Sequence, residues 1–323
     1  MSEATVSKSA SAINVVAPTG GYSSGQVILL PDGRAGIVLG LANPAAGGTV
    51  AVEVEGQFTV AKTASIVILE GGEVMWDHSA NSATIPLYTD SKDFYLGRLI
   101  NGDAASADTT LVVDLNADRN SAYITLEKSP FGILRVLTAG FPSGAMCGGG
   151  FHAAFSPTAE AQKIDLLSKQ AFALDSNWIC ETTVNVLAAA DADVVDINIG
   201  VANATHASDA DSITESCFIH LDSSGSSNIL AESDDGTTEV AATDTTIDWA
   251  AGTAFHVVFD GRDPSDVQLY INGVNRLAAT VFDISAATGP LRALFHFEKS
   301  ANDSLCDVLL QKFEVRLTAD VEA

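Results

Sequence analysis

The sequence predicts an all-β protein made of two β domains. Its apolar residues make up 47% of 323 residues and favour Val, Ile and Ala, with 26 glycines among many Thr, Ser and Asp. This mixture is typical of strands joined by turns rather than of helices. Short apolar runs separated by turn residues recur along the chain, and a chain of this length usually divides into two domains.

The first segments in the chain are a flexible arm and a domain of short strands. Residues 1–14 are small and polar, with little to bury, so we expect an arm, followed by a β domain over residues 15–118. Within residues 49–55, Val50, Val52 and Val54 alternate with polar residues, which indicates a half-buried antiparallel strand. The other strands are expected at 27–30, 35–39, 57–60, 65–69, 74–76, 94–100 and 109–115.

A polar, turn-prone stretch over residues 116–121 marks the boundary, and residues 119–323 form the second domain. The alternating segments there are longer, which is typical of a two-sheet jelly-roll sandwich. We expect its strands at 131–137, 178–186, 194–201, 216–221, 254–259, 267–271, 291–297 and 309–317. Two short stretches, 90–94 and 159–167, are capable of forming helices.

The net charge and the lack of targeting patterns restrict which partners and compartments are expected. The net charge of −25 repels phosphate and anionic membranes, and no basic cluster interrupts it, so we expect neither nucleic-acid nor membrane binding. The sequence contains no signal-peptide pattern and no apolar run of 18 residues, so synthesis in a cytoplasm is expected. The cysteines Cys147, Cys180, Cys217 and Cys306 lack zinc-site spacing and are interpreted as free buried thiols.

The first domain resembles the phage capsid cement (decoration) family. Residues 16–38 contain a glycine-bounded turn followed by two strands, residues 47–60 repeat the family's glycine and valine spacing, and residues 95–99 resemble a later strand. The resemblance covers residues 15–115 and implies a fold like that of the decoration proteins of lambda-type phages. Those proteins form trimers on the shell and lock neighbouring major capsid subunits together.

The resemblance also implies a place and a contact surface for this protein. It would be made in the host cytoplasm and lie on the outer capsid surface of the virion, as a homotrimer bound to the major capsid protein. Because a flexible segment can become ordered on binding, the arm would add a strand to an edge of the capsid protein. The expected contact residues, in the arm and the adjacent turn, are Ala12, Ile13, Asn14, Val15, Val16 and Tyr22.

The second domain resembles the concanavalin-like (laminin-G-like) jelly roll. The similarity lies in residues 254–260, in residues 266–274 with the hairpin turn at Asn272 and Gly273, and in residues 309–317. Such domains bind glycans in many proteins and are structural in others, since fold does not fix function. Candidate contacts to a host-surface glycan or another partner are Trp178, Trp249 and Asn272, although core packing is the simpler explanation for both tryptophans.

No motif in the sequence predicts catalysis, a metal or a cofactor. Residues 21–25 match the G-x-S-x-G pattern, but a strand rather than a helix is expected after them, so they are interpreted as a turn. The best strand carboxylates, Glu53 with Glu55 and Asp193 with Asp196, do not form a glycosidase pair: the first two lie on a polar face and the others on opposite faces. The histidines lack metal spacing, and the acidic pairs at 191/193, 209/211 and 234/235 are interpreted as surface turns rather than calcium ligands.

The sequence therefore favours a binding protein over an enzyme. The leading hypothesis is a trimeric decoration protein whose first domain stabilises the capsid while the jelly roll projects outward. One alternative is a glycan-binding adhesion module on a virion, and a further one is a polysaccharide-active enzyme. The sequence leaves open whether the jelly roll binds glycans or is only structural.

Overall fold

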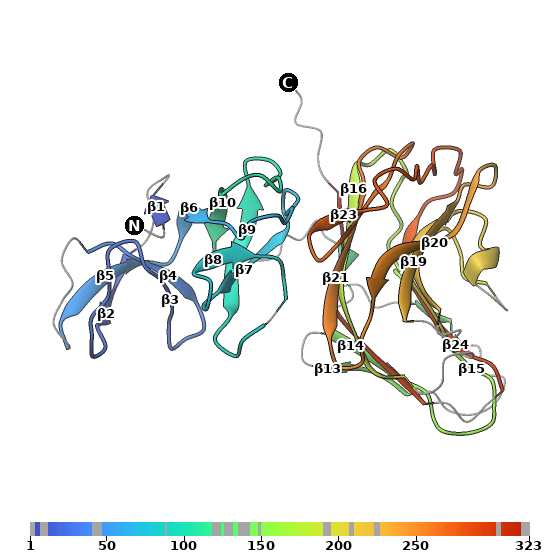
Figure 1. The fold of residues 1–323 in the computed structure, drawn as a ribbon, viewed down its shortest axis with the longest axis horizontal. Helices are drawn as coiled ribbons and strands as arrows, with labels where there is room; N and C mark the ends of the chain where they lie inside the picture. Colours follow the sequence, from blue (N-terminus) through green and yellow to red (C-terminus); the bar gives the residue numbers. More distant parts are fainter. Residues whose placement is uncertain are drawn as a thin grey trace. The chain divides into compact units, whose positions relative to one another are not determined.

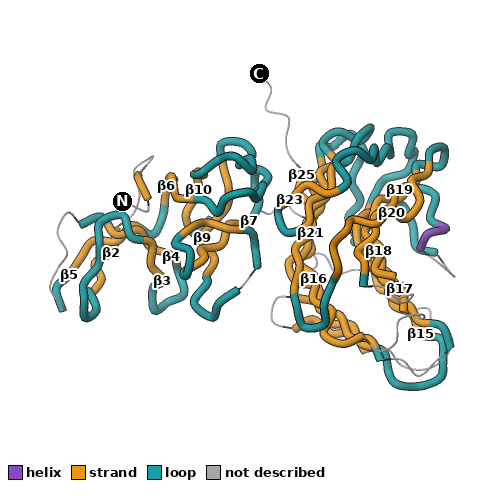
Figure 2. Tube along the Cα trace, viewed as in Figure 1, coloured by secondary structure: helices purple, strands orange, loops and turns teal. Residues whose placement is uncertain are grey.

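The protein is all-β, as the sequence predicts, and forms two compact units (Figures 1 and 2). The first unit comprises residues 1–120 with 272–274, and the second 121–271 with 275–323. The computed structural model describes residues 4–6, 12–40, 47–87, 89–117, 124–125, 132–134, 143–147, 150–189, 195–206, 210–222, 227–301 and 305–317. Within these ranges one 3₁₀ helix, η1 (Ala210–Ser212), accompanies the strands. The function assigned to each domain from the sequence stays a prediction.

The first unit contains a six-stranded and a four-stranded antiparallel sheet. The six-stranded sheet has the order β1 (Ala4–Val6), β6 (Gly56–Ala61), β10 (Thr110–Leu115), β9 (Phe94–Ile100), β7 (Glu73–Asp77) and β8 (Ser82–Thr84). The four-stranded sheet has the order β2 (Ala12–Val16), β5 (Thr49–Glu53), β4 (Ala35–Val38) and β3 (Val27–Leu29). Phe58, Trp76 and Leu96 are buried in the main core of this unit, which also includes Ala35 and Ile37 of β4.

Strand β5 confirms the predicted alternation but corrects one of its faces. Val50, Val52 and Val54 are buried in a small second core of this unit, as expected. Glu55 is exposed, whereas Glu53, predicted to be solvated, is only 8% exposed. The reason is tertiary: β5 is an interior strand, and Glu53 lies opposite Ala12 on one side and opposite residue 37 on the other.

Three other segments of the first unit differ from expectation. Residues 4–6 and 12–14, expected in a flexible arm, lie in β1 and β2: the two segments pair with β6 and β5, Ala4 is buried in the main core of the unit, and Ile13 packs against its small second core. Residues 65–69 form a loop with one bridge, Ile68 to Ala104, instead of a strand. Residues 90–94, considered helix-capable, begin with a turn, because the Asp93 carboxylate accepts hydrogen bonds from the amides of Thr89 and Asp90.

The second unit is a sandwich of two antiparallel sheets around one core. The eight-stranded sheet has the order β13 (Ser143–Cys147), β14 (Gly150–Ala154), β25 (Cys306–Leu317), β16 (Trp178–Ala189), β21 (Ala254–Gly261), β22 (Gln268–Ile271) and β23 (Val274–Arg276), and β11 (Ile124–Thr125) pairs with β25. The seven-stranded sheet has the order β12 (Gly132–Leu134), β15 (Gln162–Leu167), β24 (Arg292–Lys299), β17 (Val195–Ala202), β18 (Ser216–Asp222), β19 (Asn228–Asp234) and β20 (Glu239–Asp248). Apolar residues of both sheets, Val184 and Phe295 among them, meet in the core.

Two local predictions for residues 119–323 have opposite outcomes. Asn272 and Gly273 join β22 to β23 with φ angles of 52° and 74°, the left-handed pair that a two-residue type I′ hairpin requires. Residues 159–167, considered helix-capable, instead contain β15, which pairs with β12 and β24. Its polar residues at 163 and 165 face partners on the neighbouring strand, and this long-range pairing outweighs local propensity.

The cysteine prediction is confirmed wherever side chains are described. Cys180, Cys217 and Cys306 are free and buried, and burial raises the pKa of the Cys306 thiol to about 12. The side chain of Cys147 lies outside the described residues. Among the described residues, no helix reaches the length and apolarity that crossing a membrane would require.

Candidate functional site

The predicted capsid contact lies on an edge strand of the four-stranded sheet. Strand β2 pairs with β5 on one side, and no described strand pairs with its other side. Ile13 and Val15 point inward and pack, with Tyr22, against the small core around β5. Ala12, Asn14 and Val16 point outward, and Val16 is 65% exposed. The six candidate residues therefore divide into three that support the strand and three that present its surface.

The backbone of β2 also offers unpaired groups. Ala17 donates a hydrogen bond to the carbonyl of Gly48 (2.8 Å) and accepts one from the amide of Gly47 (3.0 Å), so its polar groups point toward β5. Because these groups alternate along an antiparallel strand, those of Asn14 and Val16 point toward the open edge. Such an edge can take up a further strand from another chain.

The candidate glycan contacts do not form one surface. Trp178 is fully buried in the core of the second unit, beside Phe172 (5.7 Å between ring centroids) and over Gly261, its partner on β21. A fully buried ring cannot stack on a sugar. Trp249 is half-buried against the same core, and Asn272 occupies the β22–β23 turn. The structure thus places Trp178 in a packing role.

A row of polar side chains crosses four neighbouring strands of the seven-stranded sheet. Asp165 on β15 lies opposite His296 on β24, His296 lies opposite Asn198 on β17, and Asn198 lies opposite His220 on β18. His296 and Asn198 are fully buried. The other face of these strands packs into the sandwich core, so this row occupies the opposite face.

A second row lies two residues further along the same face. Lys163 on β15 is opposite Glu298 on β24, and Glu298 is opposite Asp196 on β17. Together with carboxylates from β19 and from η1, the two rows make what we call the polar cluster: Lys163, Asp165, Asp196, Asp211, His220, Glu232, His296 and Glu298. These five carboxylates and three basic groups leave a net charge of −2 even when both imidazoles are protonated.

Both histidines of the polar cluster are held by carboxylates. The Nδ1 atom of His296 lies 2.5 Å from Asp165 Oδ1, and its Nε2 lies 3.3 Å from Glu298 Oε2. Burial lowers the pKa of His296, but these two carboxylates outweigh it and raise the pKa to about 9.

His220 is more strongly held than His296. Its Nε2 lies 2.9 Å from Asp196 Oδ1, and its Nδ1 lies 3.2 Å from Glu232 Oε1 and 3.5 Å from Asp211 Oδ1. Burial lowers the pKa of His220, but hydrogen bonding to Asp196 and Glu232 outweighs burial and raises the pKa to about 11. His220 is therefore a cation that helps to balance these carboxylates at neutral pH.

The eight-stranded sheet carries a different polar group, which we call the arginine cluster: Glu181, His256, Glu314 and Arg316, all buried. Arg316 Nη1 donates to Glu181 Oε2 and, at 3.0 Å, to Glu314 Oε1, while His256 Nε2 lies 3.0 Å from Glu181 Oε1. Burial raises the pKa of Glu181, but Arg316 and His256 outweigh it and hold the pKa well below its usual range.

Local sequence pattern did not predict that the residues of the polar cluster meet. The spacing of the histidines indicates no metal site, and Asp196 was paired only with Asp193, which lies outside the described residues. A usable signal was present: polar residues two apart interrupt apolar strands at 163/165, 196/198 and 296/298. Three such pairs on neighbouring strands must share a face, but the sequence does not say which strands are neighbours.

The other sequence motifs occupy turns. Residues 21–25 form a loop that leads into β3, with the Gly25 amide donating to the Val38 carbonyl (2.7 Å). In the acidic pair at 234/235, the Asp235 carboxylate accepts hydrogen bonds from the amides of Thr237 and Thr238. A carboxylate used in this way closes a turn. Residues 191, 193 and 209, also named as calcium candidates, lie outside the described residues.

A family comparison distinguishes the first unit. Residues 6–115 match the family model of phage cement proteins. The match covers about a third of the chain and includes strand β2 with its open edge. This part of the chain is therefore similar to phage cement proteins. No curated protein matches the chain.

Solved structures resemble the chain only distantly. The carbohydrate recognition domain of Emp47p has a TM-score of 0.42 at 11% identity, covering 63% of this chain and 92% of its own. The carbohydrate-binding module CBM66 from Bacillus subtilis has 0.35 at 8%, covering 60% and 94%. An endo-β-1,4-glucuronan lyase from Trichoderma reesei has 0.40 at 10%, covering 61% and 95%. Similarity this distant supports no argument about what this chain binds or does.

Proposed function

We propose that this protein is a capsid decoration protein that binds the outer shell of a phage as a trimer and stabilises it. The observation that carries the proposal is the match of residues 6–115 to the phage cement family. The second unit is then a projecting β-sandwich, and the binding requires no chemistry. Weak contacts repeated in a trimer would give high avidity, because the second and third contacts become intramolecular.

The open edge of β2 is the proposed contact with the major capsid protein. It combines backbone groups that lack a partner strand with an exposed apolar side chain, Val16. A strand of the capsid protein would pair with this edge through its main chain, and Val16 would lose its contact with water. This replaces the expectation of a free arm with that of a strand already held by its own sheet.

Co-sedimentation of the full chain with capsids lacking it tests the proposal. We expect binding at fixed stoichiometry, a trimer in analytical ultracentrifugation of the released protein, and decorated capsids that withstand heating better than bare ones. A chain that remains in the supernatant at every capsid concentration would overturn the proposal.

A matched pair of variants tests the edge. Val16→Asp places a charge on β2, and Leu29→Asp places one on β3, the opposite edge strand, where Leu29 is 47% exposed. We expect at least a tenfold loss of capsid affinity for V16D and little change for L29D. Asn14→Pro should also weaken binding, because it removes an outward amide while leaving the β2–β5 hydrogen bonds intact. Loss in L29D alone would move the contact to the other edge.

A further inference from the structure

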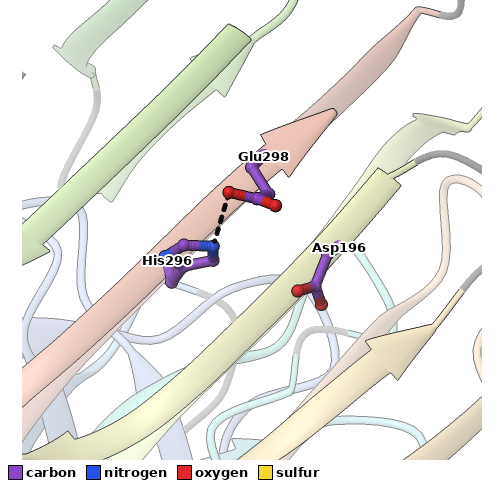
Figure 3. Close-up of side chains that lie close together, drawn as sticks. All are labelled: Asp196, His296 and Glu298. Carbon is purple, nitrogen blue, oxygen red and sulfur yellow. Dashed lines mark ion pairs between the residues drawn. The ribbon is translucent and has the colours of Figure 1, made fainter. Parts of the chain in front are cut away.

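The carboxylates of Asp196 and Glu298 and the imidazole of His296 lie near one another on the outer face of the seven-stranded sheet, with His296 and Glu298 paired on one strand and Asp196 on the next (Figure 3). His296 and Glu298 lie two residues apart on β24, and Asp196 lies opposite Glu298 on β17. One possible ligand atom from each lies within 4.8 Å of the other two. The three side chains therefore come from two interior strands of the sheet, with Asp196 near the start of β17 and Glu298 near the end of β24.

His296 presents its Nε2 atom to this point. Because Nδ1 lies 2.5 Å from the Asp165 carboxylate, it donates its hydrogen there, and the neutral ring then carries its lone pair on Nε2. Nε2 is fully buried and makes no hydrogen bond within the described part of the chain, where its partner is the Glu298 carboxylate, in an ion pair at 3.3 Å. A histidine oriented by a carboxylate through Nδ1, with Nε2 available, is the usual arrangement of a metal ligand.

The distances suit a small divalent ion. Ligand atoms about 2.1 Å from a tetrahedral ion lie about 3.4 Å apart, and His296 Nε2 is 3.3 Å from Glu298 Oε2. Without an ion, the two atoms are too far apart for a good hydrogen bond. Asp196 closes the third side from β17, and its Oδ1 also contacts His220 Nε2 at 2.9 Å.

The charge of the surrounding side chains and their exposure to solvent also favour binding of a cation. With His296 Nε2 unprotonated, the five carboxylates of the polar cluster, the Lys163 ammonium and the His220 imidazolium leave a net charge of −3, which a divalent ion would reduce to −1. Lys163 Nζ lies 3.2 Å from Asp165 Oδ2 and 3.4 Å from Glu298 Oε2. The side chains of Asp196 and Glu298 are 23% and 26% exposed, which gives the ion a path from solvent to the buried imidazole.

We propose that Asp196, His296 and Glu298 bind one divalent transition-metal ion. Asp165 is the positioning residue that orients the imidazole. One nitrogen and two carboxylate ligands favour Zn²⁺ or Mn²⁺ over Ca²⁺ and Mg²⁺, which prefer oxygen alone. The ion takes the place of any proton on Nε2, links β17 to β24, and leaves its remaining coordination position to water.

Calorimetric titration of the EDTA-treated full chain with ZnCl₂ tests this site. We expect one Zn²⁺ per chain, with at least a tenfold loss of affinity in His296→Gln and in Glu298→Gln. Asp165→Asn should weaken binding 10–100-fold, as removal of a positioning carboxylate does elsewhere. The control is His152→Gln, which removes a half-exposed histidine paired with Asp307 on the other sheet and should leave the affinity unchanged.

Two results would overturn the proposal. The first is an affinity of E298Q for Zn²⁺ equal to that of the wild type. Because Glu298 is partly exposed, this variant keeps the test valid even where circular dichroism shows that H296Q fails to fold. The second is binding of Ca²⁺ as tight as that of Zn²⁺, which would exclude the nitrogen ligand. Co²⁺ provides a separate readout, since ligation by His296 gives visible absorption that H296Q lacks. None of these measurements involves capsids, so the outcome is independent of the proposed function.

Discussion

The two sheets of the sandwich each bury a histidine among carboxylates, but they balance the charge differently. In the arginine cluster one guanidinium contacts both Glu181 and Glu314, and His256 adds a second contact to Glu181. In the polar cluster five carboxylates share one ammonium and two imidazoles, and three of its carboxylates, those of Asp196, Asp211 and Glu298, are partly open to solvent. A fully buried network of this kind holds strands together, whereas a partly exposed one with excess carboxylates can also bind a cation.

The largest expected effect is the loss of the guanidinium. Arg316→Met leaves Glu181 and Glu314 buried without it, and breaking a buried ion pair in this way costs about 3–5 kcal/mol of unfolding free energy. Urea denaturation at pH 7 would measure the loss. A loss below about 1 kcal/mol would mean that water reaches these carboxylates and that the two clusters do not differ as described.

Zn²⁺ should stabilise one cluster and not the other. At a free Zn²⁺ concentration 100 times the dissociation constant, a site present only in the folded state adds about 2.7 kcal/mol to the free energy of unfolding. We expect this increase in the wild type and in R316M, but not in Glu298→Gln. Thermal or urea unfolding with and without Zn²⁺ provides the measurement. An equal increase in all three proteins would place the ion elsewhere.

Acid should weaken the arginine cluster in a defined range of pH. The pKa of Glu181 is lowered in the folded state, so its stabilisation is present above the unfolded-state pKa of about 4.3 and is lost as the pH falls below that. The free energy of unfolding of the wild type should therefore fall more steeply between pH 5 and pH 3 than that of Glu181→Gln. Asp93, Glu215 and Asp235, whose pKa values are also lowered, account for the slope that remains. Parallel curves would contradict this assignment.

The smallest effect is expected at the surface. Arg34 pairs with Asp32 at 2.8 Å in an exposed turn of the first unit. Solvent and salt screen such a pair, so Arg34→Met should leave the unfolding midpoint in urea unchanged within error. It is the exposed control for R316M, since both replace an arginine that contacts a carboxylate two residues away, but Arg316 is buried and also contacts Glu181. A loss similar to that of R316M would show that burial is not the cause.

Much of the fold could be predicted from local pattern. The alternation of Val50, Val52 and Val54 predicted a strand with one buried face, and the Asn272–Gly273 pair predicted a two-residue hairpin. Both depend on interactions within a few residues, which the sequence contains in full. The burial of Glu53 and the strand at residues 162–167 could not be predicted in this way, because each depends on neighbouring strands that are distant in sequence.

The candidate sites also differ in whether local sequence pattern or long-range strand pairing determines them. The sequence by itself determined the all-β class and the resemblance of the first domain to cement proteins, since composition, turns and alternation are local properties. Only the tertiary structure decided that β2 is an open edge and that Asp196, His296 and Glu298 meet. The physical reason is register: pairing β24 with β17 brings together side chains about 100 residues apart in sequence, and no local pattern specifies that pairing.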